Sequence, residues 1–146
     1  MLNHSFEHMP DPLRQLTYLE KLLSDGGICM VRVPVASSYA WRHYGVDWVQ
    51  LDAPRHLYLH TPMSMGILAE KSGLEVFDIR YDSTYFQFTG SEMYARNISL
   101  SEAENMPSEQ FSRRAVRRYQ HMAEKLNAKG LGDQAAFYLR RRTQDH

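Results

Sequence analysis

Near the amino terminus, one short stretch brings together two imidazoles and a carboxylate. His4-Ser5-Phe6-Glu7-His8 matches the pattern H-x-x-E-H, in which inverted zinc proteases carry two metal-binding histidines. That chemistry needs both histidines on one helical turn. Pro10 and Pro12 follow too closely for a long helix to run through Glu7 and His8. We therefore predict no metal site in this chain.

A second cluster, Asp52-Ala53-Pro54-Arg55-His56, places a carboxylate, a guanidinium and an imidazole on a loop set by a proline. His56 could take a proton from a substrate hydroxyl, because the ordinary pKa of imidazole lies near neutral. In the alternative interpretation, Asp52 and Arg55 pair to hold the loop and His56 packs beside them. The pairing interpretation is favoured for Asp52 and Arg55, and both interpretations stay open for His56.

The stretch 35–60 that contains this cluster is rich in aromatic residues and shows no sustained hydrophobic period. It follows the expected strand 28–34, and ligands of open α/β sheets bind beyond the carboxyl ends of parallel strands. Long irregular stretches in compact domains are typical of loops that cover a site. We therefore expect a substrate-side loop over 35–60. Trp48 within it is expected first as a packing anchor.

Local signals predict the elements that position these residues. Leucines at helical spacing predict a helix over 12–23, with Asp11 as its N-cap and Gly26-Gly27 supplying a left-handed C-terminal cap. The apolar run 28–34 predicts a strand buried on both faces, and residues 1–4 fit the tail of an earlier strand. Strand, helix and strand make a right-handed βαβ unit.

The rest of the chain continues this alternation. We expect a helix over 62–72, capped by Thr61 and stopped by Gly73, and a strand over 74–80. A helix over 108–129 and a last strand over 135–139 follow. The fold class is therefore α/β. The sequence contains no dinucleotide-binding glycine pattern, phosphate-binding loop or serine-hydrolase elbow.

Composition narrows the class of protein. The chain has 146 residues, a formal net charge of zero and one cysteine, Cys29. This length fits one domain, 1–146, and the single cysteine suggests a reducing compartment. No apolar run approaches a membrane span, so we expect a cytoplasmic protein with no membrane partner. Zero net charge argues against nucleic acid, and the arginines near 113–118 fit a solvated helix face better than a phosphate-binding patch.

Three motifs carry a resemblance to class I S-adenosylmethionine-dependent methyltransferases. They are E-H-x-x-D-P at Glu7–Pro12, L-L-x-x-G-G at Leu22–Gly27, and the D-x-P-R-H loop at Asp52–His56. The resemblance implies a partial Rossmann-like sheet made of that fold's fourth to seventh strands, with flanking helices, the aromatic loop 35–60 and a helical insertion over 101–130. The last strand would run antiparallel to the others.

The resemblance also implies roles for individual residues. Asn3 and His4 follow the fourth strand and would bind the cofactor, S-adenosylmethionine, at its sulfonium side. Trp48, Asp52 and Arg55 would bind a small-molecule acceptor. His8 or His56 would be the catalytic base, and the mechanism needs no obligatory metal. Related ubiquinone-pathway O-methyltransferases place acidic and histidine metal ligands at this post-strand position, and His4, Glu7 and His8 would align with them. Because His4 replaces the first carboxylate of that set, a metal is the less favoured alternative.

The first three strands of that fold, and the glycine-rich loop that cradles the cofactor, are not in this sequence. We therefore expect a truncated domain that supplies the acceptor side of methyl transfer and is inactive, and a poor binder of the cofactor, by itself. The alternative is a catalytically inactive binding or assembly module derived from a methyltransferase. Because the fourth strand would be an open sheet edge, we also expect self-association through residues 1–10.

Overall fold

The computed structural model describes residues 1–104 and 111–143. Residues 103 and 104 are described in backbone only. The residues cluster into two compact units, each built from separate stretches of the chain. The first comprises 1–36, 53–80 and 134–146, and the second comprises 37–52 and 81–133.

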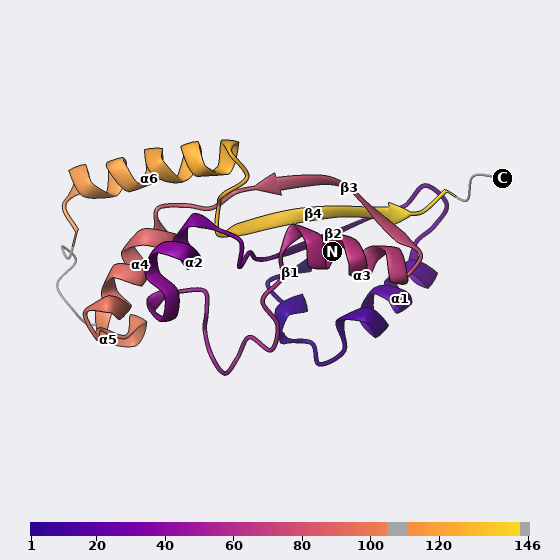
Figure 1. The fold of residues 1–146 in the computed structure, drawn as a ribbon, viewed down its shortest axis with the longest axis horizontal. Helices are drawn as coiled ribbons and strands as arrows, with labels where there is room; N and C mark the ends of the chain where they lie inside the picture. The colour runs from indigo at the N-terminus through magenta and orange to yellow at the C-terminus, as the bar shows by residue number, and fades with distance from the viewer. Residues whose placement is uncertain (105–110, 144–146) are drawn as a thin grey trace. The chain divides into compact units, whose positions relative to one another are not determined.

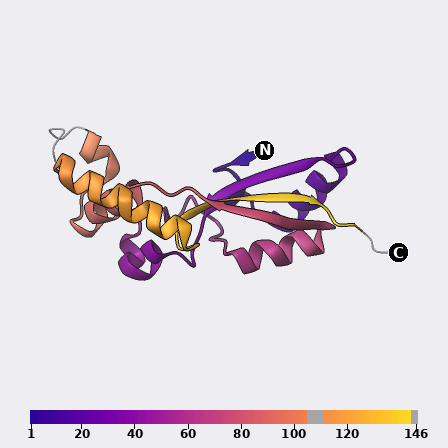
Figure 2. The same ribbon diagram turned by 90° about the horizontal axis from the view of Figure 1, so that it is seen from above.

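A four-stranded sheet in the order β1-β2-β4-β3 forms the centre of the first unit. Its strands are β1 (Leu2–Asn3), β2 (Ile28–Pro34), β3 (Leu74–Tyr81) and β4 (Gln134–Arg141). β1 pairs parallel with β2, and β4 pairs antiparallel with β2. The arrow of β3 also runs opposite to that of β4 in Figure 1, and Figure 2 shows these strands fanning apart with the usual sheet twist. The expected βαβ unit and antiparallel last strand are both confirmed.

Two helices, α1 (Pro12–Leu22) and α3 (Pro62–Lys71), pack together and lie on the same side of this sheet (Figure 1). Both connect parallel strands by crossovers in the same direction across the sheet. Right-handed crossovers therefore place them on one face. No other α-helix belongs to the described residues of this unit. Among the described residues of this unit, no α-helix covers the opposite face of the sheet.

That arrangement corrects the prediction that strand 28–34 is buried on both faces. Cys29, Val31 and Val33 are buried, and in register with Leu139, Phe137 and Ala135 they form the apolar layer of one face. On the other face Ile28 is 58% exposed, while Met30 and Arg32 are half-buried. The strand reads as continuously apolar in sequence, but only one of its faces is fully covered.

The cap of α1 also differs in part from the expectation. The side chain of Asp11 accepts a hydrogen bond from the backbone N–H of Arg14, so the predicted N-cap is confirmed. The helix ends earlier than predicted, at a C-cap residue, Leu23, with extended backbone. Gly26 has the left-handed φ of 71°, but it turns the chain toward β2 and does not cap the helix.

The second unit is helical. It contains α2 (Tyr39–Tyr44), a 3₁₀ turn at Gly45–Asp47, α4 (Phe86–Ala95), α5 (Leu100–Glu104) and α6 (Arg113–Ala128). The stretch 35–60 is therefore partly helical and is divided between the two units, which corrects its description as one long loop. The helix expected over 108–129 corresponds to α6, and residues 105–110 lie outside the described residues.

A buried carboxylate anchors the second unit. Asp133 accepts hydrogen bonds from Trp48 Nε1 at 3.1 Å and Gln50 Nε2 at 3.2 Å. Burial raises the pKa of Asp133, and these bonds, together with one from Ser83, oppose that rise. The fully buried Trp48 is thus held by packing and by its own N–H.

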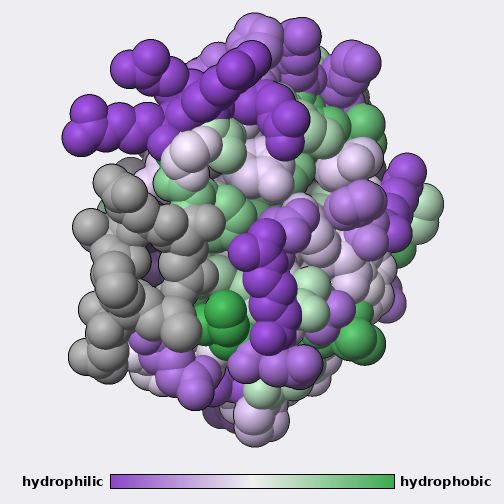
Figure 3. Space-filling view, turned by 90° about the vertical axis from the view of Figure 1, so that its left-hand side faces the viewer, coloured by the Kyte–Doolittle hydropathy of each residue, from purple (hydrophilic) through white to green (hydrophobic). Residues whose placement is uncertain are grey.

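Helix α6 shows how the same unit meets solvent. Its inner side packs against Phe88 through a cluster that includes Ala123 and Leu126. Its outer side carries exposed arginines and forms the hydrophilic upper rim in Figure 3. The expected solvated arginine face is therefore seen at residues 113–118. Within the described ranges, no helix is both long enough and apolar enough to cross a membrane.

Helix α3 begins with a reciprocal cap that follows directly on His60. Thr61 Oγ1 accepts from the backbone N–H of Ser64 at 3.1 Å, and Ser64 Oγ accepts from the N–H of Thr61 at 2.8 Å. The predicted helix start and the stop at Gly73, whose φ is 80°, are both confirmed. The cap fixes the direction in which the chain leaves the loop 53–60.

Replacing this cap should weaken the fold measurably. We expect Thr61→Ala to lower the free energy of unfolding by about 1 kcal/mol, because it removes an acceptor for an otherwise orphaned helix N–H. Thr61→Ser keeps the hydroxyl and serves as the matched control. Urea unfolding followed by circular dichroism measures both, and equal midpoints for wild type and Thr61→Ala would contradict the capping role.

Candidate functional site

The candidate site lies in the first unit, where β1 and β2 end side by side. Asn3 stands opposite Arg32 in the sheet, and the N–H of His4 donates to the carbonyl of Arg32 at 3.0 Å. Just beyond β2, Val35 forms a parallel bridge with His60. The segments after β1 and before α3 therefore meet at the carboxyl ends of two parallel strands, the edge at which open α/β sheets bind ligands.

Backbone and side-chain hydrogen bonds hold the segment after β1 against the loop before α3. The carbonyl of Glu7 accepts from the N–H groups of Leu57 and Tyr58, at 2.9 and 3.3 Å. The hydroxyl of Tyr58 donates to the carbonyl of Pro10 at 3.0 Å. His8 Nδ1 lies 2.8 Å from the carbonyl oxygen of Arg55. Four contacts thus bring together two segments that are about fifty residues apart in sequence.

The Glu7 side chain is buried at the centre of this junction. It is only 1% exposed, and neither carboxylate oxygen receives a hydrogen bond from the described residues. Its nearest charge partners are His4 Nδ1 at 3.6 Å and His56 Nε2 at 3.9 Å, both measured to Oε1. Burial raises the pKa of Glu7, but the two imidazoles and the local backbone outweigh it and hold the pKa below its usual value.

Imidazole rings surround this carboxylate. The rings of His8 and His56 lie 4.8 Å apart, and His60 stacks on Phe6 at 5.0 Å. His60 is itself buried, and burial lowers its pKa while the charge of Glu7 opposes that change. The result is a compact cluster of titratable side chains, of which Glu7 and His60 are buried.

The cluster fits two kinds of chemistry. One ligand atom from each of Glu7, His8 and His56 lies within 4.8 Å of the other two, so these residues could hold a metal ion. The same imidazole nitrogens could also receive a proton from a bound hydroxyl or amine. Asn3 is the last residue of β1, and His4 follows it directly.

The structure brings only some of the predicted site residues together. Asn3, His4, His8, Arg55 and His56 all belong to the first unit. Trp48 and Asp52 belong to the second unit, where Trp48 is bonded to Asp133 and Asp52 has a left-handed φ of 42°. The acceptor-binding roles of Trp48, Asp52 and Arg55 stay predictions.

Two residues of the cluster were missed as site residues by sequence reasoning. Glu7 was considered only as a ligand in the less favoured metal alternative, and His60 was assigned no role. The sequence signal that could have marked Glu7 as a site residue is its charge, which stands between the aromatic rings of Phe6 and His8. No local signal marks His60, because its burial results from the bridge to Val35.

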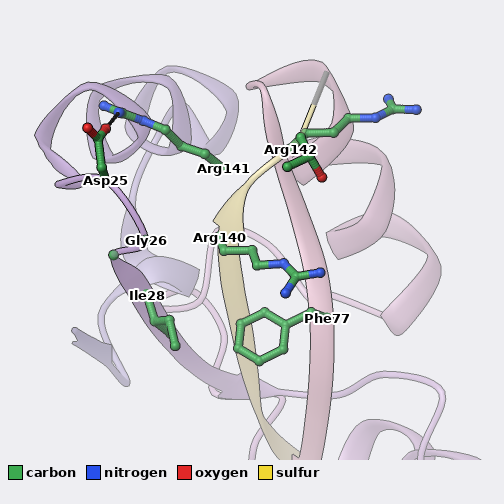
Figure 4. A pocket seen from close by; sticks show the side chains of 9 residues that line it. Asp25, Gly26, Ile28, Phe77, Arg140, Arg141 and Arg142 are labelled. Carbon is green, nitrogen blue, oxygen red and sulfur yellow. Dashed lines mark hydrogen bonds and ion pairs between the residues drawn. The ribbon is translucent and has the colours of Figure 1, made fainter. Parts of the chain in front are cut away.

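A separate pocket lies at the other end of the sheet and has a structural explanation (Figure 4). It is lined by residues from the turn 25–28 and from the end of β4, with Phe77 beneath the guanidinium of Arg140. Each of its arginines has a carboxylate partner: Arg140 pairs with Glu75, Arg141 with Glu20 and Asp25, and Arg142 with Glu70. These pairs lie at the amino end of β2, away from the histidine cluster.

Comparison with known proteins gives one family match. Residues 1–79, more than half of the chain, match the model of a family described as a methyltransferase domain. No curated protein matches the chain.

Solved structures give matches of low identity. A SAM dependent methyltransferase from Archaeoglobus fulgidus is 19% identical, with a TM-score of 0.45, over 97% of this chain and 57% of that one. A protein described as a sarcosine dimethylglycine methyltransferase from Galdieria sulphuraria is 15% identical, with a TM-score of 0.48, over 94% of this chain and 50% of that one. The chain thus spans about half the length of these two solved structures.

The hydrogen bond of His8 predicts which of its ring nitrogens carries the proton. A carbonyl oxygen can only accept, so Nδ1 must be the donor to Arg55 and neutral His8 must have an unprotonated Nε2. We expect the ¹⁵N shifts of His8 to show a protonated Nδ1 in a long-range ¹H–¹⁵N spectrum. His121, an exposed histidine on α6, is the internal control and should show the Nε2–H tautomer usual in solution. An Nε2–H form at His8 would contradict the bond.

Proposed function

The chain belongs to the S-adenosylmethionine-dependent methyltransferase domain family, and on this premise we propose that it contributes the acceptor side of methyl transfer to a small molecule. The observation that carries the proposal is the cluster of buried Glu7, exposed His8 and half-buried His56 at the carboxyl ends of β1 and β2. Ligands of this kind of sheet bind at that edge.

When bound, S-adenosylmethionine supplies a methyl carbon made electrophilic by the adjacent sulfonium. An oxygen, nitrogen or carbon of the acceptor would receive this methyl group, and the leaving sulfur would keep the electron pair of the broken carbon–sulfur bond. The acceptor loses a proton to complete the balance. We propose His8 and His56 as the catalytic residues, because their rings lie 4.8 Å apart at this edge of the sheet and His56 Nε2 lies 3.9 Å from the carboxylate of Glu7.

Asn3 and His4 are proposed to contact the cofactor. They lie at the end of β1, and the left-handed φ of His4, 46°, turns the chain away from the strand immediately after Asn3. The described residues hold no loop of closely spaced glycines after a parallel strand, so these two residues could supply only part of a cofactor site. We therefore propose that the chain by itself binds S-adenosylmethionine weakly and has little activity.

A second candidate function is a binding or assembly module without catalysis. The observation that favours it is length, since the chain spans 57% and 50% of the two solved structures described above. In this case the cluster at Glu7 would stabilise the fold without contacting a cofactor or an acceptor.

A titration with S-adenosylmethionine separates the two candidates. We expect the backbone amide signals of Asn3 and His4 to shift in ¹H–¹⁵N spectra, with a dissociation constant of roughly 1 mM, because so few contacts are available. Asn3→Ala should abolish the shifts. The absence of any shift at about 10 mM ligand would contradict cofactor binding by this chain and support the second candidate.

The catalytic assignment has its own test. Transfer of a tritiated methyl group to a panel of small-molecule alcohols and amines is sensitive enough to follow slow turnover. We expect His56→Ala to lower the transfer rate by about 100-fold, the usual contribution of a positioned acid or base. His121→Ala, on the surface of α6, is the matched control and should leave the rate unchanged. Equal rates in both variants would remove His56 from the mechanism.

We also propose self-association through β1. This strand pairs with β2 on one side, and no strand of the described residues pairs with its other side. An unpaired edge favours pairing with a second chain. We expect light scattering to show a dimer in wild type and a monomer in Leu2→Pro, because proline cannot donate to a strand ladder. A monomeric wild type at high concentration would contradict the proposal.

A further inference from the structure

The buried carboxylate of Glu7 presents an electrostatic problem that the described residues solve only in part. Its exposure is 1%, and neither oxygen makes a hydrogen bond of good geometry with the described residues. Removing a carboxylate from water without such partners costs several kcal/mol. The imidazoles at 3.6 and 3.9 Å lie near the charge but are too far away to satisfy it as donors.

The residues around Glu7 have the types and the orientation of metal ligands. Glu7, His8 and His56 each offer a ligand atom within 4.8 Å of the others. Tetrahedral zinc ligands lie roughly 3.3 Å apart, so small side-chain rotations would close the set. His8 donates Nδ1–H to the backbone carbonyl of Arg55, which leaves the lone pair of Nε2 for a cation. Metal-binding histidines usually donate their second N–H to a carbonyl or carboxylate in this way.

We propose that Glu7, His8 and His56 form a binding site for a divalent transition cation, with Zn²⁺ as the cation that fits this ligand set best. Two imidazoles and one carboxylate make a three-ligand zinc site, and such a site keeps a fourth position open for water or an acceptor atom. The cation would neutralise the orphaned carboxylate. This revises the sequence-based prediction that the chain holds no metal.

The helical pattern that argued against a metal is not required by the observed geometry. Sequence reasoning placed both metal-binding histidines on one helix, His4 and His8. In the structure, Phe6–His8 is a short 3₁₀ turn, and the second imidazole of the set, His56, comes from the loop before α3. The hydrogen bonds from Leu57 and Tyr58 to the carbonyl of Glu7 hold that loop in place. The ligands therefore come from two segments that the fold fixes together.

The proposed metal site has one consequence for methyl transfer, and this consequence rests on the proposed function. A cation at the open position would bind an acceptor oxygen and favour its deprotonated form, since bound Zn²⁺ lowers the pKa of coordinated water to about 7. His8 and His56 would then act as ligands of the cation rather than as bases themselves, and the cation would favour loss of the acceptor proton. Binding of the cation itself requires neither cofactor nor acceptor.

The test is metal binding by the untagged chain after treatment with a chelator. We expect calorimetric titration with Zn²⁺ to show one site per chain, and Co²⁺ at the same site to give visible absorption bands that Zn²⁺ displaces. Glu7→Gln and His56→Ala should each weaken binding by about 100-fold, as expected when a ligand is removed. Circular dichroism must show that both variants remain folded.

His121→Ala is the matched control, because His121 also lies near a glutamate, Glu124, at 3.8 Å but on the exposed face of α6. Its binding should equal that of wild type. Wild-type stoichiometry well below one, or equal affinity in Glu7→Gln and wild type, would overturn the proposal. That result would leave the shifts of Asn3 and His4 with S-adenosylmethionine untouched, so failure of the metal site and failure of the proposed function are distinguishable.

Discussion

The candidate site depends on the backbone carbonyl of Glu7. This single acceptor takes hydrogen bonds from Leu57 and Tyr58, and the bond between His8 and Arg55 lies beside it. Without this junction, the segment after β1 and the loop before α3 would be two independent surface segments. With it, an acid and several imidazoles from both segments share one small volume. The capped start of α3 and the bridge between Val35 and His60 hold the far end of the same loop.

The burial of the Glu7 carboxylate works against the stability of the fold. A glutamate that is almost fully buried without a hydrogen-bond donor costs free energy, and an apolar side chain in its place would avoid that cost. Such costs are typical of functional positions. By contrast, the arginines of the pocket at the opposite end of the sheet all pair with carboxylates. The two ends of one sheet thus carry a strained polar cluster and a set of satisfied ion pairs.

The fold accounts for the place of the site. Two right-handed crossovers set α1 and α3 on one face and leave the carboxyl ends of β1 and β2 side by side. The antiparallel β4 lies between β2 and β3, so the parallel edge at β1 and β2 is where the polar residues gather. Membership of the methyltransferase domain family agrees with this placement, because residues 1–79 include both strands and the whole cluster.

The sequence by itself determined the elements that have strong local signals. Capping residues and helical periodicity located α1 and α3, an apolar run located β2, and the motifs around Glu7 and His56 indicated the family. Local signals failed for α2 and α4, which have mixed aromatic and polar sequences and are formed through packing in the second unit. Only the tertiary structure decided that Glu7 is buried and that His56 lies beside it. The physical reason is that these contacts are made between segments of the chain that lie about fifty residues apart. A local pattern of residue types carries no information on which distant segments pack together or form hydrogen bonds.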